Sequence, residues 1–291
     1  MKKIFLFLTL ILCLSLILSG CSFPTGNTKM EKTQNSHSTV KAAAPADKNK
    51  TAVPNTHQSE TVNTTGWIHV AHPAQIPILM YHSISTGGNS LHVSAAEFSS
   101  EMKWIKDHGY ETLTPEEADL ILTKDMKPKK KCVLITLDDG YQDNYTTAFP
   151  ILKKYHMHAT IFMIGKSIGR HNHLTKPEML QMAENGISIQ SHTIHHLELS
   201  LLSNANQQAE LVQSKQLFDR ILHQKTLMIS YPSGRYNPET LKLSEQAGYK
   251  MAVTTEPGAA SRTQGMFALH RIRIVPGMSL IGFGRILDRA N

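Results

Sequence analysis

The sequence predicts a parallel α/β fold, closed or nearly closed, for most of its 291 residues. Short apolar runs alternate along the chain with segments that carry the apolar spacing and the capping residues of helices. That alternation is typical of βαβ units, in which a helix connects two parallel strands. Apolar residues make up 41% of the chain and charged residues 18%, which is enough apolar surface for a core. Because chemistry in such folds sits at the carboxyl ends of the strands, the residues after each apolar run matter most.

The first residues of the chain predict an export signal rather than a part of the fold. Two lysines at positions 2–3 precede an apolar stretch over residues 4–18, which is too short for a comfortable membrane span. The stretch ends in LSGC (residues 18–21), which resembles a lipobox, the acylation signal of bacterial lipoproteins. That resemblance implies a signal peptide over residues 1–20 and an acylated Cys21 as the mature N-terminus. An ordinary signal peptide or a short anchor is the alternative.

Residues 21–72 predict a disordered tether, because Ser, Thr, Asn, Lys, Pro and Ala dominate and large apolar residues are scarce. We therefore expect a lipid anchor on the extracytoplasmic side of the cell membrane and a folded domain over residues 73–291. The net charge of +7 favours an approach to anionic wall polymers and lipids, and no nucleic-acid partner is expected. Only Cys132 follows the lipobox, which excludes a disulfide framework.

The folded domain begins with an apolar run at residues 76–81, which predicts a buried strand. A capping box at residues 94–97 opens a helix that ends at Gly109, and residues 114–117 open another with Pro115 at its first position. Further strands are expected at residues 132–137, 159–164, 187–191, 227–231, 249–254 and 267–275. Further helices are expected at residues 143–155, 175–185, 203–222 and 238–247.

Two adjacent carboxylates, Asp138 and Asp139, follow the strand at residues 132–137. Two bare carboxylates side by side repel each other, and one of them tends to be protonated. A bound cation removes the conflict for one carboxylate, and the other can stay ionised beside a metal-bound water and take its proton. The pair therefore predicts one metal ligand and one general base.

Two histidines, His192 and His196, follow the strand at residues 187–191. On a helical turn, a spacing of four puts both imidazoles on one side, which is a common arrangement for a divalent metal. Together with one carboxylate they predict a three-ligand site that keeps a position open for water, as catalytic zinc sites do. Zinc fits these ligands best, and cobalt, nickel and iron also accept them. His195, between the two, is expected to be a spectator.

The stretch TLDDG (residues 136–140) and the pattern His-Thr-x-x-His (residues 192–196) resemble, in this order and spacing, the first two motifs of the polysaccharide deacetylases, the NodB-like carbohydrate esterases. The resemblance covers residues 73–291. It implies a distorted (β/α) barrel of about seven parallel strands that removes acetyl groups from glycans with a bound divalent metal. It also implies that Asp138 is the general base and that the metal ligands are Asp139, His192 and His196.

A third motif of the family is partly present in SYPSG (residues 230–234), where many members carry Arg-x-Pro-aromatic-Gly. The resemblance implies that the backbone N–H of Ser233 donates to the oxyanion. The usual arginine is absent, and Ser230 occupies its position. The group that orients Asp138 is therefore open, with Arg271 and Arg273 of the last predicted strand as the candidates.

The general acid has two candidates. Many family members place a histidine in a late Leu-x-His motif, and the nearest late histidine here is His270. The stretch ILMYH (residues 78–82), however, is similar to the N-terminal motif of a branch that deacetylates poly-N-acetylglucosamine, in which the motifs are circularly permuted. Because a histidine at a strand end in a barrel points into the site, His82 is favoured over His270.

These observations predict a metal-dependent hydrolase that removes acetyl groups from an N-acetylglucosamine-containing polysaccharide of the cell surface, either exopolysaccharide or peptidoglycan. Two alternatives stay open. One is a glycan-binding wall protein that kept the fold and lost turnover, which the missing arginine at Ser230 supports. The other is a metal-dependent amidase or esterase for a different substrate. The oligomeric state is not predicted.

Overall fold

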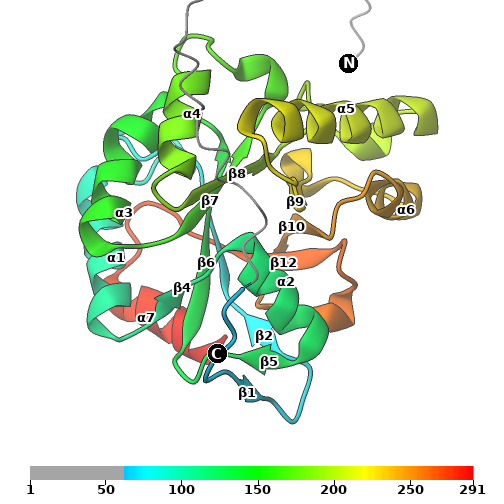
Figure 1. The fold of residues 1–291 in the computed structure, drawn as a ribbon. Helices are drawn as coiled ribbons and strands as arrows, with labels where there is room; N and C mark the ends of the chain where they lie inside the picture. Colours follow the sequence, from blue (N-terminus) through cyan, green and yellow to red (C-terminus); the bar gives the residue numbers. More distant parts are fainter. Residues whose placement is uncertain (1–61, 291) are drawn as a thin grey trace, which may run out of the picture. The chain divides into compact units, whose positions relative to one another are not determined.

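Seven parallel strands close into a ring in the computed structural model, which describes residues 62–290 (Figure 1). The closure comes from β3, which pairs with β12 on one side and with β6 on the other. A short strand, β4 (Glu111–Thr112), adds to the outer edge of β6. In order around the ring, the strands are β3 (Ile78–Tyr81), β12 (Leu269–Arg273), β10 (Met251–Pro257), β9 (Met228–Ser230), β8 (Ile187–Ser191), β7 (Ala159–Met163) and β6 (Cys132–Asp139). The predicted closed parallel fold is confirmed.

The ring is distorted on the side that carries β8, β9 and β10. The ladder between β8 and β9 is reduced to one pair, Ser191 with Ile229. The register between β10 and β12 shifts between Val253 and Pro257. Irregular pairing of this kind bends the strands locally, so the ring departs from a regular barrel on this side.

Helices lie around the outside of the strands (Figure 1). The capping box predicted at Ser94 is formed, and the helix start predicted at Thr114 is confirmed and carries a capping box as well. The predicted helix at residues 143–155 is divided into a π-helical segment, Asn144–Ala148, and α3. The helices are α1 (Ala95–Asp107), α2 (Pro115–Lys124), α3 (Phe149–Tyr155), α4 (Lys176–Ala183), α5 (Asn204–Leu222), α6 (Pro238–Gln246) and α7 (Leu280–Arg289), the last of which the sequence did not predict.

Ordered structure begins before the predicted domain start at Pro73. Strand β1 (Ile68–His69) pairs with β5 (Met126–Lys127), within the segment predicted to be a tether. A second short pair joins β2 (Gln75–Ile76) and β11 (Ala260–Ser261). The predicted signal peptide and Cys21 lie outside the described residues. Within residues 62–290, no helix has the length and apolar character needed to span a bilayer.

The interior of the ring changes from apolar to polar along the strands. On β6, Cys132 and Leu134 belong to an apolar cluster that also contains residues of α2, so α2 closes the amino end of the ring. Thr136 and Asp138 follow on the same face of β6, because side chains alternate along a strand. Polar side chains therefore gather at the carboxyl end of the ring, as expected for this fold class.

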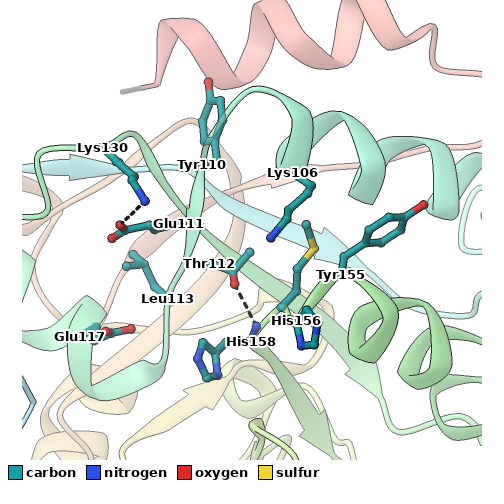
Figure 2. Close-up of a pocket in the computed structure, with 11 residues that line it drawn as sticks. Lys106, Tyr110, Glu111, Thr112, Leu113, Glu117, Lys130, Tyr155, His156 and His158 are labelled. Carbon is teal, nitrogen blue, oxygen red and sulfur yellow. Dashed lines mark hydrogen bonds and ion pairs between the residues drawn. The ribbon is translucent and has the colours of Figure 1, made fainter.

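A cavity of about 320 Å³ lies at the opposite end, beside the start of β4 and β7 (Figure 2). Lys106, Glu111, Lys130, His156 and His158 are among the residues that line it. None of the predicted site residues does so.

Candidate active site

The last two residues of β6, Asp138 and Asp139, carry the paired carboxylates. Asp138 and Asp139 are 3% and 8% exposed. Asp139 and Gly140 have φ angles of 74° and 72°, so the chain reverses sharply and Asp139 turns back toward the strand end. A Cβ at Gly140 would lie 2.0 Å from Sδ of Met163, so Met163 would have to move, and the positive φ angle of this residue favours glycine in any case.

The two histidines converge on Asp139 through a loop. The sequence predicted a helical turn, and this is wrong, because Thr193 and His196 have φ angles of 63° and 58°. The loop nevertheless brings the Nε2 atoms of His192 and His196 to 3.1 Å from each other. Each Nε2 atom lies 3.4 Å from Oδ1 of Asp139. The predicted ligand triad is therefore assembled, with its ligand atoms all within 4.8 Å of one another.

Hydrogen bonds to the backbone fix this loop and the tautomer of one ligand. Nδ1 of His192 lies 2.7 Å from the carbonyl of Ser230, so it carries the proton and leaves Nε2 free to bind a metal. Buried Glu210 of α5 accepts the N–H groups of Ile194 and His195, each at 2.9 Å. The His195 side chain also binds Glu210, at 2.5 Å, and stays out of the triad. No sequence signal pointed to Glu210, because two of its three contacts with this loop are with backbone groups.

Two imidazole nitrogens and one carboxylate oxygen form a donor set that suits a divalent transition metal, zinc above all. The triad comes from two strand ends and is largely buried, with Asp139 and His192 inside and His196 partly exposed. The residues present therefore fit a metal ion with one side open to solvent and substrate.

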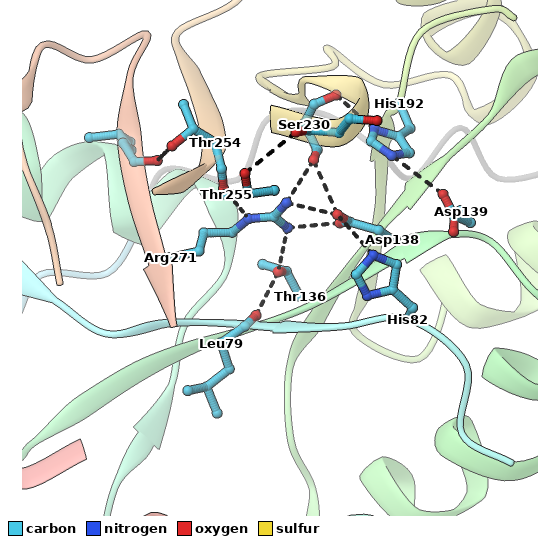
Figure 3. A network of polar contacts seen from close by, with 12 residues as sticks. Leu79, His82, Thr136, Asp138, Asp139, His192, Ser230, Thr254, Thr255 and Arg271 are labelled. Atoms are coloured by element: carbon cyan, nitrogen blue, oxygen red, sulfur yellow. Dashed lines mark hydrogen bonds and ion pairs between the residues drawn. The ribbon is translucent and has the colours of Figure 1, made fainter. Parts of the chain in front are cut away.

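Arg271 holds Asp138 with a two-pronged ion pair (Figure 3). Its Nη1 lies 2.8 Å from Oδ1 of Asp138, and its Nη2 lies 2.7 Å from Oδ2. Burial alone would raise the pKa of Asp138, but the charge and hydrogen bonds of Arg271 outweigh it and hold that pKa well below the usual range. Asp138 is therefore an anion at neutral pH.

Ser230 contacts both members of this ion pair. Its hydroxyl lies 3.0 Å from Nη2 of Arg271 and 3.3 Å from Oδ2 of Asp138. A guanidinium thus stands beside Asp138 although the third motif lacks its arginine. Of the two arginines left open by the sequence, Arg271 is in contact with Asp138, and Arg273 lies exposed at the end of β12.

His82 lies on the other side of Asp138, at the end of β3 (Figure 3). Its Nε2 is 4.0 Å from Oδ2 of Asp138, and its side chain is 13% exposed. Burial lowers its pKa, and the nearby Asp138 and Asp139 only partly offset this effect. The resting imidazole is therefore neutral.

His270 is directed elsewhere. It precedes Arg271 on β12, and successive side chains of a strand face opposite sides. Its backbone N–H donates to Gln264, and its ring lies against Gly258. The structure thus brings His82, and not His270, next to the paired aspartates.

Ser233 lies in the short turn Pro232–Gly234, which follows β9 after one residue, Tyr231. Its φ and ψ angles are 55° and 11°, and Gly234 has a φ angle of 67°. A Cβ at Gly234 would lie 2.1 Å from Oγ1 and 2.7 Å from the backbone nitrogen of Thr255, so this turn requires glycine. This turn therefore places Ser233 close to the carboxyl end of β9, at the polar end of the ring.

Comparisons with known proteins identify the family. The sequence model of the family described as Polysaccharide deacetylase matches residues 125–252. The YxkH protein of Bacillus subtilis, which is named for polysaccharide deacetylation, is 61% identical over 231 residues that cover 79% of this chain and 82% of that protein. A poly-beta-1,6-N-acetyl-D-glucosamine N-deacetylase of Staphylococcus aureus is 30% identical over 196 residues, which cover 62% of this chain and 67% of that one.

Solved structures show the same likeness. The Streptococcus pyogenes deacetylase PplD, determined in complex with acetate, is 39% identical with a TM-score of 0.72, covering 74% of this chain and 99% of that one. The polysaccharide deacetylase BC0361 of Bacillus cereus is 29% identical with a TM-score of 0.67, covering 74% and 69%. The chain belongs to the polysaccharide deacetylases, and it is a hydrolytic deacetylase.

Proposed function

We propose that the chain removes acetyl groups from the N-acetylglucosamine units of a cell-surface polysaccharide by metal-assisted hydrolysis, with exopolysaccharide as the first candidate and peptidoglycan as the second. One observation carries the proposal: Asp138 is held as an anion by Arg271, beside the triad of Asp139, His192 and His196. The Staphylococcus aureus relative, named for a poly-beta-1,6-N-acetyl-D-glucosamine, supports this substrate class.

The triad of Asp139, His192 and His196 would hold the ion, with zinc preferred and cobalt, nickel or iron as alternatives. A divalent ion bound there supplies Lewis acidity, which polarises the acetyl carbonyl and makes water more acidic. Asp138 takes a proton from the attacking water, and the N–H of Ser233 donates to the oxyanion of the tetrahedral intermediate.

His82 delivers a proton to the sugar nitrogen as the C–N bond breaks and acetate leaves. Because burial keeps the resting imidazole neutral, the proton that it delivers is the one that water gave up to Asp138, 4.0 Å away. The position of His82 beside Asp138 supports this role over His270.

A charged partner for Asp138 also bears on the alternatives. The missing arginine at Ser230 was the support for a binding protein without turnover. Arg271 of β12 supplies a guanidinium beside Asp138 instead, which removes that support. A metal-dependent amidase or esterase for another substrate uses the same residues and differs in the substrate alone.

Acetate release tests the proposal. Residues 62–291 are loaded with zinc or cobalt and given β-1,6-linked N-acetylglucosamine oligomers and, separately, peptidoglycan. We expect release from the oligomers, none after treatment with a chelator, and none from the matched variant Asp138→Asn. Acetate release from peptidoglycan alone would make peptidoglycan the substrate in place of exopolysaccharide. No release from either polymer by the metal-loaded protein would favour an amidase or esterase that acts on a different substrate.

We also propose a lipid anchor at Cys21 on the extracytoplasmic face of the cell membrane, preceded by a signal peptide over residues 1–20 and followed by a tether that joins the anchor to the folded domain. The lipobox-like LSGC supports the anchor. Labelling of cells with a palmitate analogue tests it, because the full chain should take up the label and Cys21→Ser should not.

A further inference from the structure

The loop that carries His82 is held by side chains from the segment that also supplies the paired aspartates. The imidazole of His82 makes no hydrogen bond within the described part of the chain, and its nearest ionic neighbour is Asp138 at 4.0 Å. Its direction must therefore come from the backbone that bears it. That backbone follows β3 immediately, where the ladder of β3 has ended and Ser83 forms an isolated bridge with His92.

Asn144 anchors His82 itself. Its side chain is fully buried, and its Nδ2 donates to the carbonyl of His82 at 2.9 Å and to Oδ1 of Asp143 at 3.0 Å. One amide group therefore ties the residue that bears the imidazole to the start of the π-helical segment.

Asp143 anchors the next two residues of the loop. Its Oδ1 accepts the backbone N–H of Ile84 at 3.0 Å, and its Oδ2 accepts the hydroxyl of Ser83 at 2.5 Å. Bonds to a carboxylate are stronger than neutral ones. Three consecutive residues, 82–84, are thus held by two consecutive side chains.

We infer that Asp143 and Asn144 are positioning residues that aim His82 at the leaving group, an inference that rests on the proposed role of His82. The stretch ITLDDGYQDN (residues 135–144) then sets the base, a metal ligand and the direction of the acid in one rigid unit. A general acid works only within hydrogen-bond reach of the atom it protonates, so loss of this aim should slow substrates that need a proton on the leaving group.

The test compares two substrates. An N-acetylglucosamine oligomer must leave as an amine and needs the acid, whereas 4-nitrophenyl acetate leaves as a stable phenolate and does not. Relative to the zinc-loaded wild type, we expect Asp143→Ala and Asn144→Asp to lower kcat for the oligomer about 10- to 100-fold, and kcat for the ester less than about 3-fold, with KM and metal content unchanged. Asp143→Asn, which keeps an acceptor for Ile84, should recover most of the loss.

Gln142→Ala is the matched control, because Gln142 lies in the same turn but binds Glu178 of α4 at 2.6 Å and not the His82 loop. It should leave the ratio of the two rates unchanged. In a His82→Ala background, Asp143→Ala should cause no further loss with the oligomer, because residues that act through His82 are not additive with it. If Asp143→Ala unfolds below the assay temperature, Ser83→Ala removes one of the same bonds and gives the same comparison.

Two results would overturn the inference alone: equal losses for both substrates in Asp143→Ala, or an independent loss added to that of His82→Ala. A rate ratio that His82→Ala leaves unchanged would overturn the proposed acid, and the inference with it. Absence of acetate release by wild type from the oligomer would refute the proposed substrate. The three failures are therefore distinguishable.

Discussion

At the scale of single residues, the site depends on a buried guanidinium with no unused donor. Arg271 is completely buried, and its five N–H groups reach Asp138, Ser230, Thr136 and the carbonyl of Thr254. Such a group does not need to reorganise during the reaction. The anionic state of Asp138 is therefore prepared before substrate arrives.

Replacement of Arg271 by methionine should impair both stability and activity. Asp138 would be left as an uncompensated buried charge, at a cost of about 3–5 kcal/mol in the free energy of unfolding at pH 7. With burial then dominant, the pKa of Asp138 rises, so the acidic limb of the kcat profile should move to higher pH. Urea unfolding and a pH series of acetate release measure the two effects.

Arg271→Lys is the matched control, since lysine keeps the positive charge and loses the two-pronged hydrogen bonding of the guanidinium. Arg271→Lys should retain more activity than Arg271→Met. The acidic limb of its kcat profile should lie closer to that of the wild type. An acidic limb that stays in place in Arg271→Met would show that Asp138 is not the group that titrates.

At the scale of elements, a buried carboxyl joins α1 to β3. Glu101 of α1 is 2% exposed and accepts the hydroxyl of Tyr81 at 2.8 Å. Burial raises the pKa of Glu101 to about 7, against the partial opposition of that hydrogen bond. The folded protein therefore binds a proton that the unfolded chain has already released at pH 6.

Glu101→Gln should abolish a pH dependence of stability. A raised folded pKa favours the protonated form, so its contribution is full below the unfolded pKa of 4.5 and is lost as the pH rises through about 7. Wild type should therefore lose on the order of 2–3 kcal/mol of unfolding free energy relative to the variant between pH 4.5 and pH 8. Urea unfolding of both proteins at these two pH values measures it, and parallel curves would contradict the assignment.

The turn after β9 is a second element whose shape should matter. Gly234→Ala must displace Thr255 or the turn, because the new Cβ would lie 2.7 Å from a backbone nitrogen. We expect kcat to fall about 10-fold or more with metal content unchanged, because the N–H of Ser233 moves. Gly265→Ala is the control, since Gly265 has a φ angle of 85° and no atom within 4 Å of its Cβ position. Equal losses in both variants would mean that backbone strain alone matters.

The strands and helix starts could be predicted from the sequence because short-range patterns determine them. Apolar runs and caps such as Ser94 and Thr114 act within a few residues, so they identify strands and helix starts before any tertiary structure is known. The loop at His192 was mistaken for a helical turn because four-residue spacing alone does not reveal a positive φ at Thr193. Helix α7 was missed because its glycines suggest a loop, although Gly284 serves a close contact with Trp104.

At the scale of the whole domain, the ring needs strands from both ends of the described chain. The partner of Asp138 could be narrowed from sequence to two arginines and no further, because the choice depends on the register of β12 in the closed ring. The family match at residues 125–252 contains neither β3 nor β12. It therefore lacks the strands that close the ring, together with His82 and Arg271.

A fragment restricted to residues 125–252 should not fold. It exposes the edge of β6 with which β3 pairs, and it leaves Asp138 without the guanidinium of Arg271. We expect no cooperative thermal transition by circular dichroism, whereas residues 62–291 should melt in one step. A cooperative transition in the fragment would show that the open sheet is stable without closure.

Closure of the ring also has a consequence for the order in which the protein acquires activity. Asp138 and its guanidinium are 133 residues apart, and such distant contacts form late because the loop between them must first be closed. A growing chain that has emerged only as far as β10 has its triad side chains but no counter-charge for its base. In refolding, acetate release should lag behind the return of helical signal, so catalysis itself reports that the last strand has docked.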